Sequence, residues 1–442
     1  MRIKRLLKIL AFAGIFLVLF SIVSKILVAP NDYRNYQRVG GFYEEPENSL
    51  DAVYIGSSTC YAFWNPMVAW DKYGLAIYPY SANSQHFIAA EHLIREVRKT
   101  QPDALFIVTI NTIDDEKMNV FEFHYQIDYM PFSLNKLSLI RHLSKNANLP
   151  FREEMELYLP FYRYHERWSQ LDPQDFKYQV DGLKGVSTYS TYNYGIFDIS
   201  SMYASTDEII PPADYVNDSL MSLMDFCEEE NVNVLFVTVP RAESVTRVAE
   251  LNYINSMLES RGFATLNLLK HPEAMKFDYT QDFYNEGHTN LHGSIKYTSF
   301  LSEYLIEHYG FKSHHGDALY NGWGAGYEKY SPTMFIYALD IEMDVDHRTT
   351  DLLKPGNLTA VADGQNISVT WEASEGAEGY AVYRKAYKGC WERLSTTEEL
   401  CFTDSGAQTG IQYQYTVVPF CTSDGETFYG CFDYLGAFIE LQ

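Results

Sequence analysis

The sequence predicts an α/β domain with a doubly wound, mostly parallel sheet, preceded by one apolar helix and followed by an all-β domain. Three observations lead to this fold class. An uncharged apolar run opens the chain, strands and amphipathic helices alternate over residues 48–312, and short alternating strands fill residues 354–442. The chain has 442 residues, 46% of them hydrophobic and 21% charged, which is globular composition for two or three domains.

The first element is an apolar helix with a basic flank. Lysine and arginine residues within positions 2–8 precede an uncharged run over 9–24, which Ile26, Leu27 and Val28 extend. Such a run is long enough to span a bilayer, and basic flanks stay in the cytoplasm. We therefore expect residues 1–30 to form a transmembrane anchor of the cell membrane, with the bulk of the chain outside. A signal peptide cleaved after Ala29 is the alternative.

Strands and helices alternate next. Buried strands covered by helices on both faces are typical of a parallel sheet. The expected strands are 51–56, 75–82, 104–110, 232–240 and 264–269, and the expected helices are 84–100, 215–230, 243–262 and 292–310.

The alternation stops over residues 115–212, a stretch dense in aromatic and histidine residues. Active sites of such sheets lie beyond the carboxyl ends of the strands, so an insertion after the 104–110 strand would adjoin the site. We interpret it as a lid or substrate platform, with a helical packing domain as the alternative. Asp114, Asp115 and Glu116 at its start do not predict a metal site, since adjacent acids point in different directions.

The segment 313–353 has no period and is expected to be a linker. Residues 354–442 resemble a fibronectin type III domain, with Trp and Tyr as core anchors. Such a module would serve as a spacer or as a surface for a protein partner. Its four cysteines could form a disulfide or stay free thiols, and the sequence does not choose between these alternatives. The residues that carry the resemblance are Pro355, Leu358, Trp371, Tyr380, Val382, Tyr383, Phe402, Thr403, Asp404, Gly410, Tyr413 and Tyr415.

Two motifs are candidates for chemistry. Ser57 and Ser58 follow the first strand, on the strand-to-helix turn where a nucleophile would be exposed. His288 lies in DFYNEGHTNLHG (282–293), between the last strand and the last helix. The ends of two strands of one sheet can meet at the crevice, so His288 can reach Ser58 and take its proton.

Together these motifs resemble the SGNH (GDSL-like) hydrolase superfamily, in particular its membrane-anchored bacterial branch, over residues 48–312. The resemblance implies that Ser58 is the nucleophile and His288 the general base. It implies an oxyanion hole formed by the N–H of Ser58, the side chain of Asn111, and an N–H after the second strand. That block reads YSANSQ without glycine, so Asn83 or Ser84 would supply the N–H.

The acid of the triad departs from the family pattern. The family has an aspartate three residues before the histidine, and here that residue is Asn285. An amide can orient an imidazole, but it stabilises an imidazolium less well than a carboxylate does. Asp282 or Glu286 could serve instead, and we rank Asp282 first.

The predicted function is therefore that of a serine esterase or O-acyltransferase acting on acylated cell-envelope polysaccharide or another acylated glycan. A catalytically weak or inactive scaffold that binds glycan or protein partners is the alternative. No cofactor or metal is expected, and the formal charge of −24 argues against nucleic acid as a partner. Arg241, after the 232–240 strand, could meet an anionic substrate, but we expect it to be an exposed residue at a helix start.

Overall fold

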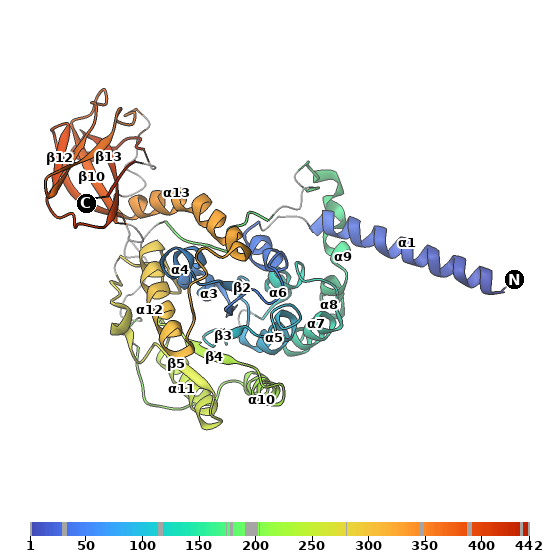
Figure 1. Ribbon diagram of the computed structural model, residues 1–442. Helices are drawn as coiled ribbons and strands as arrows, with labels where there is room; N and C mark the ends of the chain where they lie inside the picture. Colours follow the sequence, from blue (N-terminus) through green and yellow to red (C-terminus); the bar gives the residue numbers. More distant parts are fainter. Residues whose placement is uncertain are drawn as a thin grey trace.

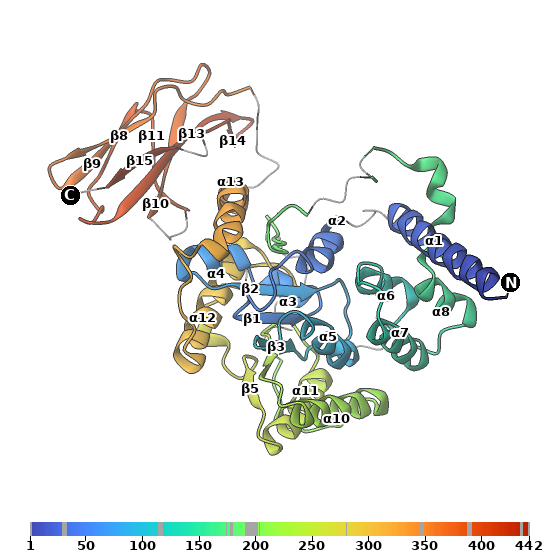
Figure 2. The same ribbon diagram turned by 45° about the vertical axis from the view of Figure 1, so that its right-hand side comes forward.

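The computed structural model describes residues 2–28, 33–113, 118–173, 175–176, 180–190, 202, 204–279, 281–343, 349, 351–386, 391–433 and 436–440. It contains one N-terminal apolar helix, an α/β domain with a five-stranded parallel sheet, and a C-terminal domain of antiparallel sheets (Figures 1 and 2). The predicted fold class is thereby confirmed.

The parallel sheet has the strand order β2-β1-β3-β4-β5. The order reverses direction at β1, so the chain winds outward first to β2 and then, on the other side, through β3, β4 and β5. All strand pairs in it are parallel. The strands are β1 (Ala52–Gly56), β2 (Ile77–Ser81), β3 (Leu105–Thr109), β4 (Val234–Thr238) and β5 (Ala264–Asn267).

Helices cover both faces of this sheet, because successive side chains of a strand point to opposite faces. Tyr54 and Ile107 pack with α3 (Ser58–Phe63) and α12 (Leu291–Tyr309). Val53 and Phe106 pack on the other face. The helices of that face are α5 (Ala90–Val97), α10 (Asp214–Glu229) and α11 (Val245–Ser260).

The helix predicted over residues 84–100 starts later than predicted, at Ala90. Ser84 does not cap a helix: its backbone is left-handed, with φ +50°. The 3₁₀ turn η2 (Phe87–Ala89) precedes α5 instead, and the side chain of His86 accepts the Ile88 N–H at its start. This frees the segment after β2 to form a loop at the edge of the sheet where the site lies.

A segment before the predicted domain start belongs to the same core. It comprises α2 (Tyr33–Asn35) and the π-helical turn η1 (Tyr36–Gly40). Arg38 is 1% exposed, lies over the Tyr61 ring at 3.7 Å, and donates to Asn35 Oδ1 at 2.6 Å. A buried arginine needs such partners. No hydrophobic periodicity in the sequence predicts this packing.

The insertion is helical. Within 115–212 the described residues form α6 (Val120–Ile127), α7 (Leu134–Asn146), α8 (Phe151–Tyr158), α9 (Pro160–Tyr164) and the 3₁₀ turn η4 (His165–Gln170). These helices pack side by side next to α5 (Figure 2). The helical alternative therefore describes the insertion from α6 to η4, whereas a later part reaches the candidate site through Tyr189. Residues 114–117, including the acidic run, lie outside the described residues.

The predicted linker is largely a helix. After the 3₁₀ turn η7 (Ala318–Tyr320), α13 (Asn321–Met343) runs along α4 (Pro66–Tyr73). Its packing overrides the poor helix propensity of its glycines and proline. Trp323, 2% exposed, donates its Nε1–H to Glu45 at 3.2 Å, and a Cβ on Gly326 would lie 2.5 Å from the Gly182 carbonyl oxygen.

The C-terminal domain consists of two antiparallel sheets, ordered β12-β9-β8 and β11-β10-β13-β14, with β15 paired to β13. Trp371 and Tyr415 lie in its core, and Tyr413 Oη accepts the Gln408 N–H at 2.9 Å. The five cysteines described are all free thiols, and Cys390 lies outside the described residues. The strands are β8 (Thr359–Asp363), β9 (Asn366–Thr370), β10 (Gly379–Ala386), β11 (Trp391–Thr397), β12 (Cys401–Asp404), β13 (Gln412–Ser423), β14 (Glu426–Tyr429) and β15 (Ala437–Glu440).

The N-terminal helix α1 (Arg2–Val28) projects from the body of the protein (Figure 1). Its Leu7–Val28 segment is long and apolar enough to cross a membrane, with a mean hydropathy of 2.4. Length and composition are equally those of a signal sequence or of a signal-anchor.

Candidate active site

Ser58 lies at the carboxyl end of β1, at the first residue of α3. The strand ends at Gly56, where a Cβ would lie 3.0 Å from Thr109 side-chain atoms of the neighbouring strand. Ser57 caps the helix, since its Oγ accepts the Thr59 N–H at 3.3 Å. The close packing and the cap together fix the sharp turn that presents Ser58 at the edge of the sheet.

His288 reaches Ser58 from a two-stranded hairpin formed by β6 (Phe283–Asn285) and β7 (His288–Thr289). The hairpin lies immediately before α12, and Thr289 Oγ1 donates to the Ala62 carbonyl of α3 at 2.6 Å. His288 Nε2 lies 2.8 Å from Ser58 Oγ. The structure thus brings together the predicted nucleophile and base, which are 230 residues apart.

Asn285 occupies the acid position of the relay. Its Oδ1 lies 2.7 Å from His288 Nδ1 and accepts the Gly287 N–H at 3.0 Å. A backbone N–H can only donate, so the Asn285 atom that it meets is the oxygen. The same oxygen must then accept from Nδ1–H, and Nε2 is left to accept the Ser58 hydroxyl proton. Asn285 therefore holds His288 in the tautomer that a general base requires.

The structure corrects the prediction that ranked Asp282 first for this role. It is 2% exposed, and its Oδ2 accepts from Lys296 Nζ at 2.5 Å and from the Asp278 N–H at 2.7 Å. The carboxylate thus holds the start of the hairpin against α12. Proximity in sequence placed Asp282 and Asn285 near the histidine, but the pairing of Asn285 with His288 in the hairpin decided which one faces it. Glu286 contributes its backbone carbonyl to the Ala242 N–H, at 2.9 Å.

The structure also corrects the prediction that the Asn111 side chain belongs to the oxyanion hole. It is fully buried, and its Nδ2 donates to the Val239 carbonyl at 3.2 Å and to Glu243 Oε1 at 2.9 Å. Its Oδ1 accepts the Val239 N–H at 2.8 Å. Both amide protons are engaged, so this side chain ties the ends of β3 and β4 together and is not available to an oxyanion.

The two predicted backbone donors after β2, Asn83 and Ser84, differ in whether their N–H already has a hydrogen-bond acceptor. The Asn83 N–H donates to Asn35 Oδ1 at 3.1 Å, and Asn83 Oδ1 accepts from Arg38 and Tyr61. Asn83 is thus also excluded as a backbone donor to the oxyanion. Ser84 remains: among the described residues, its N–H has no hydrogen-bond acceptor.

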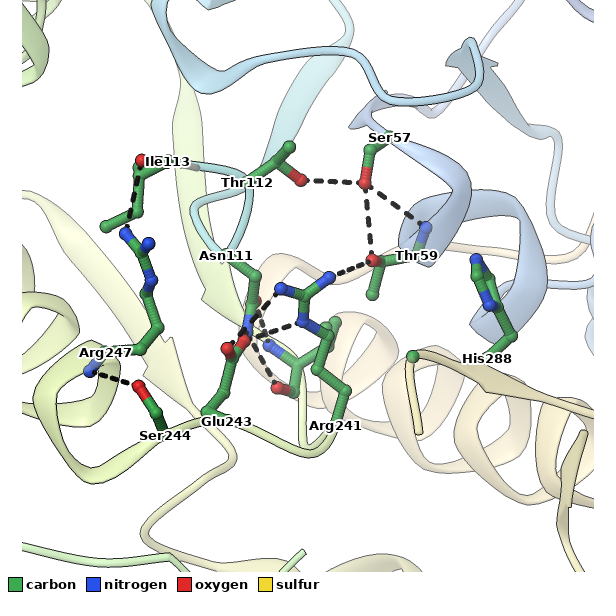
Figure 3. Close-up of polar contacts among 12 residues, drawn as sticks. Ser57, Thr59, Asn111, Thr112, Ile113, Arg241, Glu243, Ser244, Arg247 and His288 are labelled. Carbon is green, nitrogen blue, oxygen red and sulfur yellow. Dashed lines mark hydrogen bonds and ion pairs between the residues drawn. The ribbon is translucent and has the colours of Figure 1, made fainter. Parts of the chain in front are cut away.

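Arg241 is not the exposed residue that the sequence suggests. Its side chain is 11% exposed, and its Nε donates to Glu243 Oε1 at 2.7 Å. Figure 3 shows it between Glu243 and Thr59, whose Oγ1 it meets at 3.4 Å. On the far side of Thr59, the Thr112 hydroxyl donates to Ser57 Oγ at 2.8 Å. This network holds the turn on which Ser58 lies. The only sequence signal for the network was that its residues lie near the ends of strands.

Two tyrosines adjoin His288. The Tyr189 and Tyr284 rings are stacked, with centroids 4.3 Å apart and an interplanar angle of 2°. The Tyr189 ring lies 5.6 Å from the His288 ring, and Tyr284 is 37% exposed. We refer to this pair as the tyrosine shelf. Burial raises the pKa of Tyr189, so its hydroxyl stays protonated at neutral pH.

Competing groups near the site are inert. Cys60 is fully buried, and burial raises the pKa of its thiol, which disfavours the reactive thiolate. Burial lowers the pKa of His292, which is therefore neutral. The described part of the chain has no group of three or more His, Cys, Asp or Glu side chains that could hold a metal ion.

Comparisons with known proteins concern the C-terminal domain. No family profile matches the chain, and no curated protein does. Solved structures that match include an Fn3-like protein from Clostridium thermocellum, which is 28% identical over 21% of this chain and 96% of that chain, with a TM-score of 0.18. They also include FN3tt mut, 13% identical over 20% of this chain and 94% of that one, with a TM-score of 0.17. Pectate lyase Pel3 from Pectobacterium carotovorum is 17% identical over 19% of this chain and 26% of that one, with a TM-score of 0.16. The C-terminal domain is Fn3-like.

Proposed function

We propose that this protein is a membrane-anchored, extracytoplasmic serine esterase or O-acyltransferase of the SGNH type, acting on acylated cell-envelope carbohydrate. One observation carries the proposal: the relay from Ser58 Oγ to His288 Nε2, 2.8 Å, and from His288 Nδ1 to Asn285 Oδ1, 2.7 Å. A nucleophile, a base and a group that orients the base are the components of nucleophilic acyl transfer.

The reaction follows from this relay. Ser58 Oγ attacks the ester carbonyl while His288 Nε2 takes its proton, and the tetrahedral oxyanion receives hydrogen bonds from the Ser58 and Ser84 N–H groups. Collapse breaks the bond to the alcohol, which takes the proton from His288. Water or a sugar hydroxyl gives its proton to His288 and attacks the acyl-enzyme, and the bond to Ser58 Oγ breaks as Ser58 takes that proton back. The products are those of hydrolysis or of transfer. The φ of +50° at Ser84 favours this assignment, since it is a backbone conformation typical of the glycine that the family has there.

The amide at Asn285 also supports the second candidate, a weakly active scaffold. Asn285 is neutral and gives the imidazolium no ionic stabilisation. In a serine protease, replacing the triad Asp by Asn costs about 10⁴ in kcat, in part through the wrong tautomer. The Gly287 N–H removes the tautomer part of that cost here, because it fixes the amide oxygen toward His288. We therefore expect slow turnover.

The tyrosine shelf supports carbohydrate as the alcohol part of the substrate. His288 returns its proton to the leaving oxygen, so the leaving alcohol must lie beside the imidazole. The tyrosine shelf adjoins the imidazole, because the Tyr189 ring lies next to it. Tyr284, which is 37% exposed, has an aromatic ring that can offer a flat apolar surface to the C–H face of a pyranose. The net charge of −24 favours a glycan that is not polyanionic.

Two contacts support retention of α1 as an anchor. The Phe20 ring lies 5.3 Å from the Phe161 ring of α9, and Arg167 donates to the Leu27 carbonyl at 2.5 Å. Such contacts with the body of the protein have no use in a signal peptide that is removed. N-terminal sequencing of the membrane-extracted protein tests this point, and loss of residues 1–29 would refute the anchor.

The first experiment tests acyl transfer. The purified full-length chain should be labelled at Ser58 by a fluorophosphonate and should hydrolyse p-nitrophenyl acetate. Ser58→Ala should lose both activities, and His288→Ala should lose labelling because the hydroxyl then has no base. Ser260→Ala is the control, since it removes an exposed hydroxyl at the end of α11, outside the site. Absence of labelling and of turnover in the wild-type protein would favour the scaffold.

The second experiment tests the alcohol. Methyl glucoside monoacetates and ethyl acetate carry the same acyl group, but only the first has a pyranose ring. We expect Tyr284→Ala to lower the ratio of their kcat/KM values by about tenfold, with Tyr284→Trp retaining it. Tyr304, stacked on His308 at 4.1 Å in the last turns of α12, offers a control outside the site. An unchanged ratio in Tyr284→Ala, or an equal fall in Tyr304→Ala, would contradict the role of the shelf.

A further inference from the structure

The insertion exposes more apolar surface than packing within the chain explains. Five aromatic side chains of α6, α8, α9 and η4, which we call the aromatic patch, are exposed. Exposed apolar side chains scattered singly are normal, but a group of aromatic residues on neighbouring helices marks an interaction site. The patch consists of Phe121 (52% exposed), Phe151 (78%), Phe161 (36%), Tyr162 (47%) and Trp168 (73%).

Contacts between these helices make the patch one surface. Arg163 of α9 lies over the Phe121 ring of α6 at 5.7 Å, and Arg152 of α8 lies over the Tyr162 ring of α9 at 6.0 Å. Arg163 also pairs with Glu156 of α8 at 3.3 Å. Arginine and aromatic side chains together are typical of protein surfaces at the level of lipid headgroups.

The position of α1 identifies what covers this surface. The patch residue Phe161 packs on Phe20 of α1. Phe20 precedes the last helical residue, Val28, by two turns, or about 12 Å along the axis. The segment Leu7–Val28 is about 33 Å long by the same rise, close to the roughly 30 Å of a bilayer core. Phe161 therefore lies at the depth of the outer half of the segment that would cross the membrane.

Arg167 lies at the outer end of the same helix. Its NH1 donates to the Leu27 carbonyl, which has no partner within the helix, and its NH2 donates to Asp175 at 2.9 Å. In Figure 1, α8 and α9 lie on the side of the α/β domain from which α1 leaves. The helix α1 and two of the helices that carry the patch thus lie on the same side.

We propose that the aromatic patch is a membrane-contact surface that inserts its side chains into the outer leaflet around the exit of α1. The inference rests on the membrane anchor of the proposed function. Insertion would proceed by burial of apolar side chains, as in interfacial helices. It would fix the orientation of the α/β domain on the membrane, because α1 and the patch are two points of attachment.

Trp168 makes this testable by fluorescence. The chain has six tryptophans, and the other five (Trp64, Trp70, Trp323, Trp371 and Trp391) are each at most 7% exposed. The full-length chain is placed in phosphatidylcholine nanodiscs with and without bromine on the acyl chains. We expect brominated lipid to quench part of the emission, and this quenching to be lost in Trp168→Phe. Aqueous iodide should quench the wild-type protein little.

Three results would overturn the proposal. Quenching by iodide with none by brominated lipid would place Trp168 in water. Quenching by lipid that persists in Trp168→Phe would assign it to another residue. A chain that lacks residues 1–29 by intact mass and does not enter nanodiscs would refute the anchor, and with it the surface that depends on it. The mass measurement distinguishes this last failure from the first two.

Discussion

The substitution Asn285→Asp tests how the relay works. Aspartate is isosteric with asparagine, and its oxygen would keep both contacts, 2.7 Å to His288 Nδ1 and 3.0 Å to the Gly287 N–H. The variant adds a negative charge beside the imidazolium that forms in the transition state. It leaves the tautomer of His288 unchanged, so the change in rate reports the electrostatic contribution alone.

The magnitude follows from the distance. Charge centres about 4 Å apart at an effective dielectric constant of about 20 interact by roughly 4 kcal/mol. Both side chains are partly exposed, and solvent screening reduces the gain to about 2 kcal/mol. This corresponds to an increase of roughly 30-fold in kcat. The acidic limb of the pH–rate profile should also move to higher pH, because an added anion favours the imidazolium.

The assay is steady-state hydrolysis of p-nitrophenyl acetate as a function of pH, with Asn285→Ala as the control. The alanine variant should be slower than the wild type, because it no longer fixes the tautomer. Thermal unfolding of each variant verifies that the fold is retained. An Asn285→Asp protein that is folded but no faster than the wild type would refute the reasoning and return the acid role to Asp282 or Glu286.

Three further predictions concern stability. Asp282→Ala should lower the free energy of unfolding in urea by about 2–3 kcal/mol, since Lys296 loses its buried partner. A loss of kcat near 10⁴ with stability retained would instead make Asp282 the triad acid. Asn111→Ala should cost about 2–4 kcal/mol of stability through three lost buried hydrogen bonds, whereas an oxyanion role predicts a 10²–10³ loss of kcat without unfolding. Burial is the main cause that lowers the pKa of His92 from 6.5 to about 4, and the charge of His142 is the second cause. The unfolded chain therefore binds the proton first as pH falls, and stability should drop by about 2 kcal/mol between pH 7 and pH 5; a His92→Gln variant with the same pH dependence would contradict this.

The sequence predicted that Ser58 and His288 lie together, and the structure shows this contact, because it depends on strand order alone. Ser58 follows β1 and His288 precedes α12, and the ends of parallel strands meet at one edge of the sheet. The supporting residues were harder to predict. Asp282 and Asn285 are three residues apart, and the hairpin pairing decided that Asn285 faces the imidazole.

Local signals also failed where packing competes with propensity. The glycine-containing segment of α13 reads as a linker, yet Trp323 and Gly326 pack it against the α/β domain as a helix. Asn111 has the right position for an oxyanion donor, but burial against Val239 and Glu243 engages its amide. Hydrogen bonds between residues far apart in the chain leave no pattern in the sequence.

The sequence by itself determined the order of modules: an apolar helix, alternating strands and helices, and an Fn3-like domain. An uncharged apolar run marks the first, and hydrophobic periodicity encodes the alternating strands and helices because each must bury one face. The Fn3-like domain was predicted from the residues that resemble that family. Only the tertiary structure decided which polar groups meet at the edge of the sheet, because a buried amide or carboxylate is directed by whichever partner satisfies it. That is why Asn285 supports the histidine while Asp282 and Asn111 hold the scaffold around it.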